Sequence, residues 1–105
     1  MKIPAEPTCQ TVITTFEMTP GTAHDLMEAL KAAYDDFISK QPGFISAALH
    51  MNDAQTRIAN YSQWAKREDF QAMLRTEEMR ERNRVIHGLC RSFEPVMYDA
   101  QFVYN

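Results

Sequence analysis

Hydrophobic and polar residues along the chain follow two different periods. Three segments alternate at every second residue and are rich in β-branched and aromatic side chains, which predicts β-strands at residues 8–18, 44–51 and 56–64. After the first of these, apolar residues recur at every third or fourth position from Leu26 to Phe37, the spacing of an amphipathic helix. We expect Thr19 or Thr22 to cap this helix, and Pro42 to follow its end.

The second half of the chain predicts further helices and a last strand. Residues 66–74 have a helical spacing, and Thr76 is placed to cap another helix. The apolar stripe of that helix is expected to comprise Met79, Ile86, Leu89, Cys90 and Phe93. Pro95 would end it, and residues 96–104 would form the last strand.

The predicted elements define a fold class. Their order is strand, helix, strand, strand, helices, strand, the βαββαβ order of the ferredoxin-like arrangement. This α+β fold has a four-stranded antiparallel sheet with helices on one face. The other face is expected to carry Tyr61, Met97 and Val103, and a chain of 105 residues has nothing left to cover it. A second copy could cover it with two-fold symmetry, so we predict a homodimer.

Length and charge limit the classes of function. We expect one domain at residues 8–105, after a loose N-terminal arm at residues 1–7 that contains two prolines. The net charge of -3 gives no basic footprint for nucleic acid, and no apolar run is long enough to cross a membrane. The N-terminus lacks the apolar segment of a secretion signal. Cys9 and Cys90 lack metal-binding spacing, so we expect reduced thiols in a cytoplasmic protein.

The segment Asn60-Tyr61-Ser62-Gln63-Trp64 closes the third predicted strand and carries the strongest chemical signal. Side chains two apart on a strand share a face, so Asn60, Ser62 and Trp64 point the same way. An amide and an indole on an otherwise apolar face need polar partners, and a planar ligand with carbonyl or phenol oxygens would suit both. The alternative is that Asn60 pairs with neighbouring backbone and Trp64 belongs to the core.

His50 lies near the end of the second predicted strand, and its orientation depends on the hairpin that follows at residues 52–55. An even-length loop would set His50 opposite Arg57, on the face away from Asn60. A bulge would turn it to the same face as Asn60, because a slip of one residue reverses every side chain. The sequence leaves both arrangements open.

Four segments together resemble the antibiotic biosynthesis monooxygenase superfamily. They are Pro42-Gly43-Phe44, the segment from Asn60 to Trp64, Glu68-Asp69-Phe70, and Phe93-Glu94-Pro95-Val96-Met97-Tyr98. The resemblance spans nearly the whole chain, from residue 11 to residue 104. It implies a dimeric α/β barrel and, in the best-matched branch, a cofactor-free monooxygenase that oxidises aromatic polyketide phenols or anthrones to quinones.

The resemblance also implies site residues. The branch lines its pocket with an Asn and a Trp four residues apart on the third strand, which Asn60 and Trp64 match, and with a His that His50 matches. It also uses an Arg of the last helix. Counting from Trp64 without gaps selects Arg84, whereas helical phase turns Arg84 outward and brings Arg82 to the edge of the apolar stripe. We favour Arg82 slightly and keep Arg84 as its rival.

The chemistry that follows needs no cofactor. The sequence has no Gly-rich dinucleotide fingerprint and no clustered metal ligands, so an electron-rich phenol or hydroquinone would pass its electrons to O2 directly. Asn60 would donate to the substrate carbonyl, Trp64 would stack on its rings, Arg82 or Arg84 would stabilise negative charge, and His50 would transfer a proton. The side chains expected to surround the substrate, all of which also suit an ordinary core, are Phe70, Met73, Leu30, Phe37 and Tyr34.

Two other functions are open. The same fold serves as a non-catalytic, stress-responsive dimer that binds small molecules. Phe70 replaces a pocket Tyr of the oxygenase branch and so removes a hydroxyl, a departure that counts against the branch's substrate or against its activity. Heme-degrading members of the superfamily use an Asn on the first strand and a His on the late helix. The first strand here has Thr14 and Thr15 instead, and His87 lies on the polar face of its helix by phase.

Overall fold

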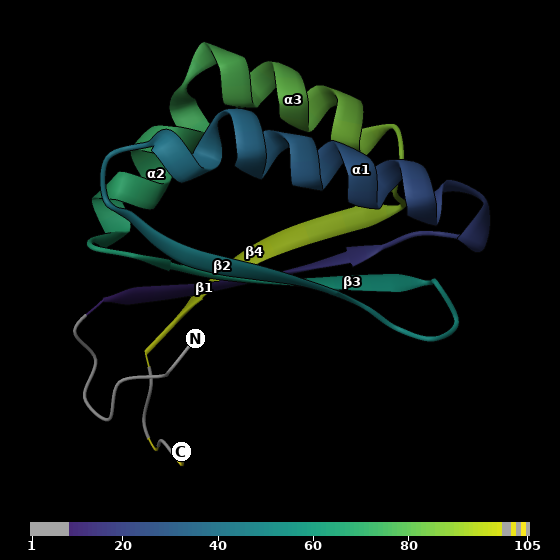
Figure 1. Cartoon of the computed structure of the whole chain (residues 1–105), viewed down its shortest axis with the longest axis horizontal. Helices are drawn as coiled ribbons and strands as arrows, with labels where there is room; N and C mark the ends of the chain where they lie inside the picture. Colours follow the sequence, from purple (N-terminus) through teal and green to yellow (C-terminus); the bar gives the residue numbers. More distant parts are fainter. Residues whose placement is uncertain (1–8, 100–101, 103, 105) are drawn as a thin grey trace.

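A four-stranded antiparallel sheet carries all the α-helices of the described chain on one face (Figure 1). The computed structural model describes residues 9–99, 102 and 104. Its elements are β1 (Gln10–Glu17), α1 (Pro20–Asp36), the short 3-10 helix η1 (Ile38–Lys40), β2 (Phe44–Met51), β3 (Arg57–Trp64), α2 (Arg67–Arg75), α3 (Glu77–His87) and β4 (Ser92–Tyr98). The strand order is β2-β3-β1-β4, which confirms the predicted ferredoxin-like α+β fold.

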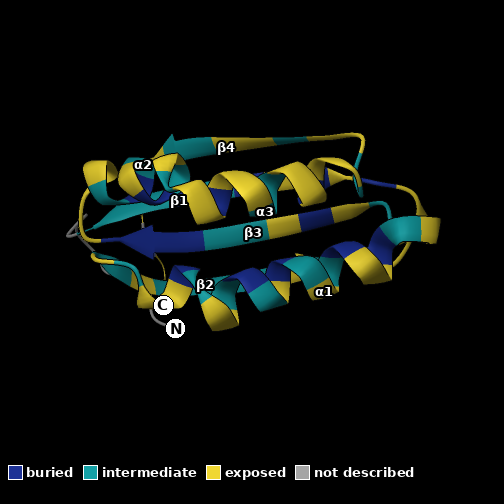
Figure 2. Cartoon of the chain, turned by 90° about the horizontal axis from the view of Figure 1, so that it is seen from above, coloured by how far each residue is buried: buried dark blue, intermediate teal, exposed yellow. Residues whose placement is uncertain are grey.

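The core lies between the sheet and the helices. Val12, Thr14 and Phe16 of β1 are buried on the helix-facing side, and the register pairs Thr14 with Asn60 of β3. Seen from above, α1 lies along β2, whereas α3 lies over the half of the sheet nearer β4 (Figure 2). Asn60 on β3 therefore faces the space between the two long helices.

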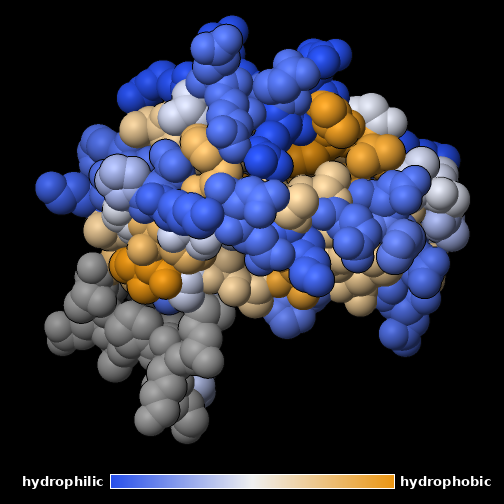
Figure 3. Space-filling view, turned by 45° about the horizontal axis from the view of Figure 1, so that its top comes forward, coloured by the Kyte–Doolittle hydropathy of each residue, from blue (hydrophilic) through white to orange (hydrophobic). Residues whose placement is uncertain are grey.

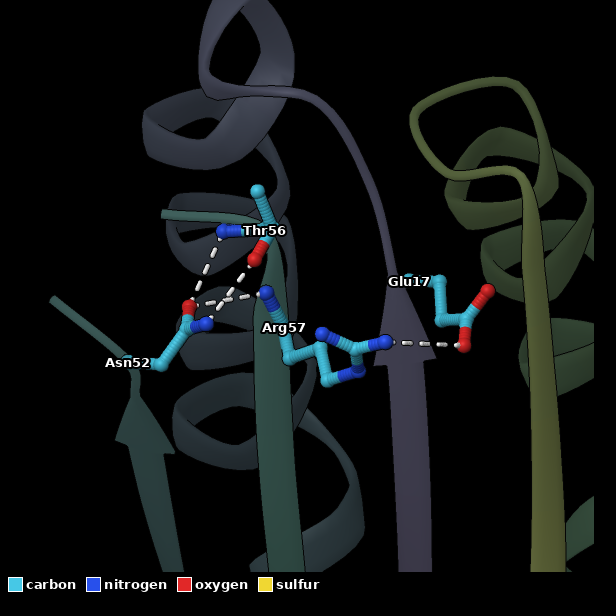
Figure 4. A network of polar contacts seen from close by, with 4 residues as sticks. All are labelled: Glu17, Asn52, Thr56 and Arg57. Atoms are coloured by element: carbon cyan, nitrogen blue, oxygen red, sulfur yellow. Dashed lines mark hydrogen bonds and ion pairs between the residues drawn. The ribbon is translucent and has the colours of Figure 1, made fainter. Parts of the chain in front are cut away.

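The β2–β3 hairpin is closed by the side chain of Asn52 (Figure 4). Its Oδ1 atom accepts hydrogen bonds of 2.9 Å from the backbone N–H groups of Thr56 and Arg57, and its Nδ2 group donates to Thr56 Oγ1 at 2.8 Å. Arg57 also forms an exposed ion pair with Glu17 of β1 at 3.7 Å. These contacts fix the turn, and the turn fixes which β2 residues share a face with Asn60.

That register decides the orientation of His50. Leu49 pairs with Asn60, and His50 pairs with Ala59, not with Arg57. His50 is exposed and lies on the sheet face away from Asn60. The arrangement that would have turned His50 toward Asn60 is therefore wrong.

Gly43, the residue before β2, lies against Asp69 of α2. Its φ of +85° is a left-handed conformation that suits glycine, and a Cβ added there would lie 2.2 Å from Asp69 Oδ2. The Gly43 carbonyl accepts a hydrogen bond of 2.7 Å from the backbone N–H of Ala65. Two of the segments that carry the family resemblance thus touch each other directly.

The end of α3 differs from the predicted one. The helix ends at His87 with Gly88 as its cap residue, and Phe93 lies on β4 instead of continuing the helical stripe. Its ring packs on Phe16 of β1 at a centroid distance of 5.2 Å. Pro95 lies within β4 and does not end a helix. An edge strand tolerates proline because one row of its amide groups has no ladder partner.

The sheet face away from the helices is also partly different from the expected one. Tyr61 lies on it, because it pairs with Ile13 of β1. Met97 was expected there, but it pairs with the buried Val12 and packs against the core. Val103 and the expected N-terminal arm, residues 1–7, lie outside the described residues.

Candidate active site

Asn60 and Tyr34 form the polar centre of the space between sheet and helices. Tyr34, on α1, donates a hydrogen bond of 2.8 Å from its hydroxyl to Asn60 Oδ1. Burial raises the pKa of Tyr34, against smaller lowering effects of its hydrogen bonds with Asn60 and Ser62, so the phenol is held as a proton donor. Among the described residues, the Nδ2 group of Asn60 has no partner. It can therefore donate to a ligand.

Trp64 lies in the core beside this centre. Its side chain is 0% exposed and makes edge contacts with Phe44 and Phe70 at centroid distances of 5.4 and 5.8 Å. Its indole N–H donates to Ser62 Oγ at 3.3 Å, and Ser62 also contacts Tyr34. Trp64 therefore supports the Tyr34–Asn60 pair through packing and through Ser62.

A cavity of about 50 Å³ lies beside Asn60. Most of its wall is apolar, and its polar groups come from four elements: Thr14, Tyr34, Asn60 and Asn83. The expected pocket residues that line it are Leu30, Tyr34, Phe70 and Met73. Phe37 is not among the wall residues. It lies at the C-cap of α1, half-buried against the core.

Asn83 also lines the cavity, a position that was not expected from the sequence. It lies on α3 four residues after Met79 and three before Ile86, two buried residues of the helix. That spacing puts all three on one helix face, so the periodicity contained the signal. The hydroxyl that Phe70 lacks has a counterpart in Tyr34, which reaches the same cavity from α1 instead of α2.

The other three candidates for the site do not line this cavity. They are His50, Arg82 and Arg84. Arg82 forms a 3.0 Å ion pair with Glu78, and Arg84 forms an ion pair with Glu81. The side chains of Arg82 and Arg84 are 29% and 73% exposed, so Arg82 is the less exposed of the two. Asn83, between them, is the residue of this segment that lines the cavity.

The described part of the chain shows neither a cluster of metal ligands nor a membrane-spanning helix. No group of three or more His, Cys, Asp or Glu side chains there is placed to hold a metal ion. None of the described helices is long and apolar enough to span a membrane. His87, the residue relevant to a heme ligand, is exposed and lies against the ring of Phe93 at 4.4 Å.

The chain belongs to the antibiotic biosynthesis monooxygenase family, because the family model matches residues 10–84. It is 32% identical over 71 residues to the tetracenomycin-F1 monooxygenase of Streptomyces glaucescens, a match that covers 68% of this chain and 63% of that one. The chain thus spans less than two thirds of the curated relative. Homologues of this chain are monooxygenases of antibiotic biosynthesis.

Solved structures share the fold. An anthrone oxidase-like protein superposes with a TM-score of 0.86 at 23% identity, covering 94% of this chain and 42% of that one. SnoaB, a cofactor-independent oxygenase from Streptomyces nogalater, superposes with a TM-score of 0.72 at 18% identity, covering 90% and 94%. At these identities the likeness establishes the fold alone.

Proposed function

We propose that the protein is a cofactor-independent monooxygenase that oxidises an aromatic phenol, anthrone or hydroquinone to a quinone with O2. The observation that carries this proposal is the Tyr34–Asn60 hydrogen bond beside a mostly apolar cavity. It fixes the amide so that Nδ2 remains available as a donor. Family membership and the tetracenomycin-F1 monooxygenase relative support the reaction class.

The reaction balances without another reductant. An anthrone methylene loses two hydrogens and gains one oxygen atom, while the second atom of O2 leaves as water. A phenol or hydroquinone balances in the same way when one ring C–H becomes C–O, which gives a quinone or a hydroxyquinone and one water. The substrate must first lose a proton, and the resulting negative charge spreads onto its oxygen. A donor aimed at that oxygen in a dry site contributes about 3 kcal/mol, or roughly a hundredfold in rate. Asn60 Nδ2 would be this donor.

The polar wall groups limit how the proton leaves. They are the hydroxyls of Thr14 and Tyr34 and the amides of Asn60 and Asn83, and none of these is a base near neutral pH. With His50 on the other sheet face, the substrate has to ionise to solvent or arrive ionised. Electron-rich anthrones and hydroquinones, whose anions are stabilised by delocalisation, suit such a site.

The first experiment is oxygen uptake with anthralin, a dihydroxyanthrone whose product is the dihydroxyanthraquinone chrysazin. We expect uptake above the spontaneous rate, with one O2 consumed for each chrysazin formed. Hydrogen peroxide as the reduced product would contradict monooxygenation. A rate equal to that of buffer for anthralin and for naphthohydroquinones would rule out the proposed function.

The functional unit we propose is a homodimer. Ile13, Tyr61 and Val96 lie on the sheet face away from the helices and are half-buried in the single chain. A second copy of the same face would remove this apolar surface from water. The two sheets would then form the walls of a barrel with the helices outside.

A binding protein without turnover is the second candidate. It is favoured by the size of the cavity, because about 50 Å³ is less than the roughly 150 Å³ of a cavity that holds benzene. Binding of chrysazin without anthralin-dependent oxygen uptake would select this function. Uptake with quinone formation would select the oxygenase.

A further inference from the structure

A second, larger hollow lies between α1 and β2. It measures about 400 Å³, which is within the range of small-molecule sites, compared with about 50 Å³ for the cavity beside Asn60. Phe44, Ala47 and Leu49 supply apolar wall, and the exposed Lys31 and Asp35 of α1 lie at its rim. The molecular face that holds α1 and β2 shows hydrophobic patches between hydrophilic side chains (Figure 3).

Tyr34 lines both the hollow and the cavity. Its side chain therefore borders both spaces, and its hydroxyl is anchored on Asn60 at 2.8 Å. The position of Leu49 is independent evidence that the hollow lies close to Asn60. Leu49 lines the hollow and is the direct strand partner of Asn60. The hollow thus borders the strand position that pairs with Asn60.

We propose that the hollow between α1 and β2 seats the rings of a planar aromatic ligand, and that Tyr34 is the movable partition through which a ligand oxygen reaches Asn60. This inference rests on the proposed function and names the route and seat of its substrate class. The cavity alone cannot admit a ring, whereas the two spaces joined can hold several.

A bound ligand can replace the hydrogen bond that Asn60 loses when Tyr34 moves. In the closed state Asn60 Oδ1 accepts a hydrogen bond from the phenol of Tyr34. A ligand phenol can take the same place when the Tyr34 ring turns aside, so one phenol–amide hydrogen bond replaces another. The ligand's second oxygen is then within reach of Asn60 Nδ2. The ring of Phe44, also part of the wall, provides an aromatic edge for the ligand.

Two kinds of variant test the inference through binding of chrysazin, which requires no turnover. Ala47→Phe fills the hollow, and its matched control is Ala72→Phe, at an exposed position of α2 outside both spaces. Trp64 is the one tryptophan of the sequence, so quenching of its fluorescence reports binding. We expect Ala47→Phe to weaken binding by at least about tenfold, and Ala72→Phe to bind as the parent does.

Tyr34→Phe tests the partition. It keeps the ring but removes the hydrogen bond that holds the wall closed, so we expect chrysazin to bind about fivefold more tightly. Weaker binding would make Tyr34 a direct ligand contact and would overturn its role as a partition. Parent-like binding by Ala47→Phe would overturn the hollow as the seat.

Two further measurements keep the outcomes separate. If Ala47→Phe does not fold, as judged by circular dichroism, Ser39→Phe at the exposed edge of the hollow replaces it. Chrysazin binding that follows these expectations, without anthralin-dependent oxygen uptake, would overturn the oxygenase and leave the inference standing. Oxygen uptake that Ala47→Phe does not alter would overturn the inference and leave the proposed oxygenase function standing.

Discussion

The hydroxyl of Tyr34 donates to Oδ1 of Asn60 across 2.8 Å, and this bond ties α1 to the third strand of the sheet. The two residues are 26 positions apart in sequence and meet over a mostly apolar cavity. The same bond orients an amide donor and closes a wall between two spaces. Its removal should therefore affect stability, ionisation and ligand access together.

Tyr34→Phe should lower the free energy of unfolding by about 1 kcal/mol, because it leaves a half-buried amide oxygen without its donor. Urea denaturation monitored by circular dichroism measures this change. Tyr98→Phe is the matched control, since Tyr98 is about half exposed and its hydroxyl has no hydrogen bond to the described residues. Equal effects of the two substitutions would contradict the role of the hydrogen bond.

The raised pKa of Tyr34 predicts how stability depends on alkaline pH. The folded state holds this proton more tightly than the unfolded state, in which the pKa is near 10.0. The resulting stabilisation is complete below about pH 10 and is lost as the pH rises through the folded pKa. Spectroscopic titration of the tyrosines should show a late ionisation that Tyr34→Phe abolishes. If the titration curve of Tyr34→Phe differed from that of the parent only in amplitude, the raised pKa of Tyr34 would be contradicted.

Asn60→Ala should lower kcat for anthralin oxidation about a hundredfold, because the donor acts on charge that develops in the transition state. Trp64→Phe should mainly affect stability. It should lower the free energy of unfolding by on the order of 1–3 kcal/mol, since the indole is fully buried. Steady-state oxygen uptake separates the two effects. If both variants match the parent rate, the reaction takes place elsewhere.

Ile13→Arg should convert the protein to monomers. Ile13 pairs with both Tyr61 and Val96 and so lies near the middle of the proposed dimer face, where a charge would lose its hydration. Light scattering should give the chain mass of 12.1 kDa for the variant and twice that mass for the parent. Val85→Arg on the exposed face of α3 is the control and should stay dimeric. A monomeric parent would end the barrel proposal.

Thr76→Ala should cost about 1 kcal/mol of stability, because Thr76 Oγ1 accepts the backbone N–H of Met79 at the start of α3. Thr19 has the same cap position on α1 but makes no side-chain cap bond, so Thr19→Ala should cost much less. Thermal unfolding of the two variants compares them directly. A larger loss from Thr19→Ala would contradict the assignment of the caps.

The order of elements could be predicted from the sequence because strand alternation and helical spacing are local signals. The position of Asn60 on the helix-facing side of β3 follows from the same alternation. The orientation of His50 could not be predicted, because it depends on how Asn52 closes the hairpin. Phe93 continued the spacing of α3 but belongs to β4, since Gly88 marks the helix end.

The candidate site was predictable only in part. Asn60 was identified by its own neighbours, and Asn83 was identifiable from the spacing of Met79 and Ile86. The Tyr34–Asn60 contact joins two elements whose relative placement depends on packing of the whole core. For the same reason, the sequence left open whether Trp64 lines the cavity or belongs to the core, and the structure places it in the core beside the cavity, not on its wall.

Pro95 has a consequence for how copies of this protein can associate. It lies in β4, an edge strand of the sheet, and has no amide hydrogen. A strand from another chain that aligned along this edge would miss a donor there, which opposes the strand-by-strand growth that leads to fibrils. The homodimer proposed above would therefore use the broad surface of the sheet and not this edge.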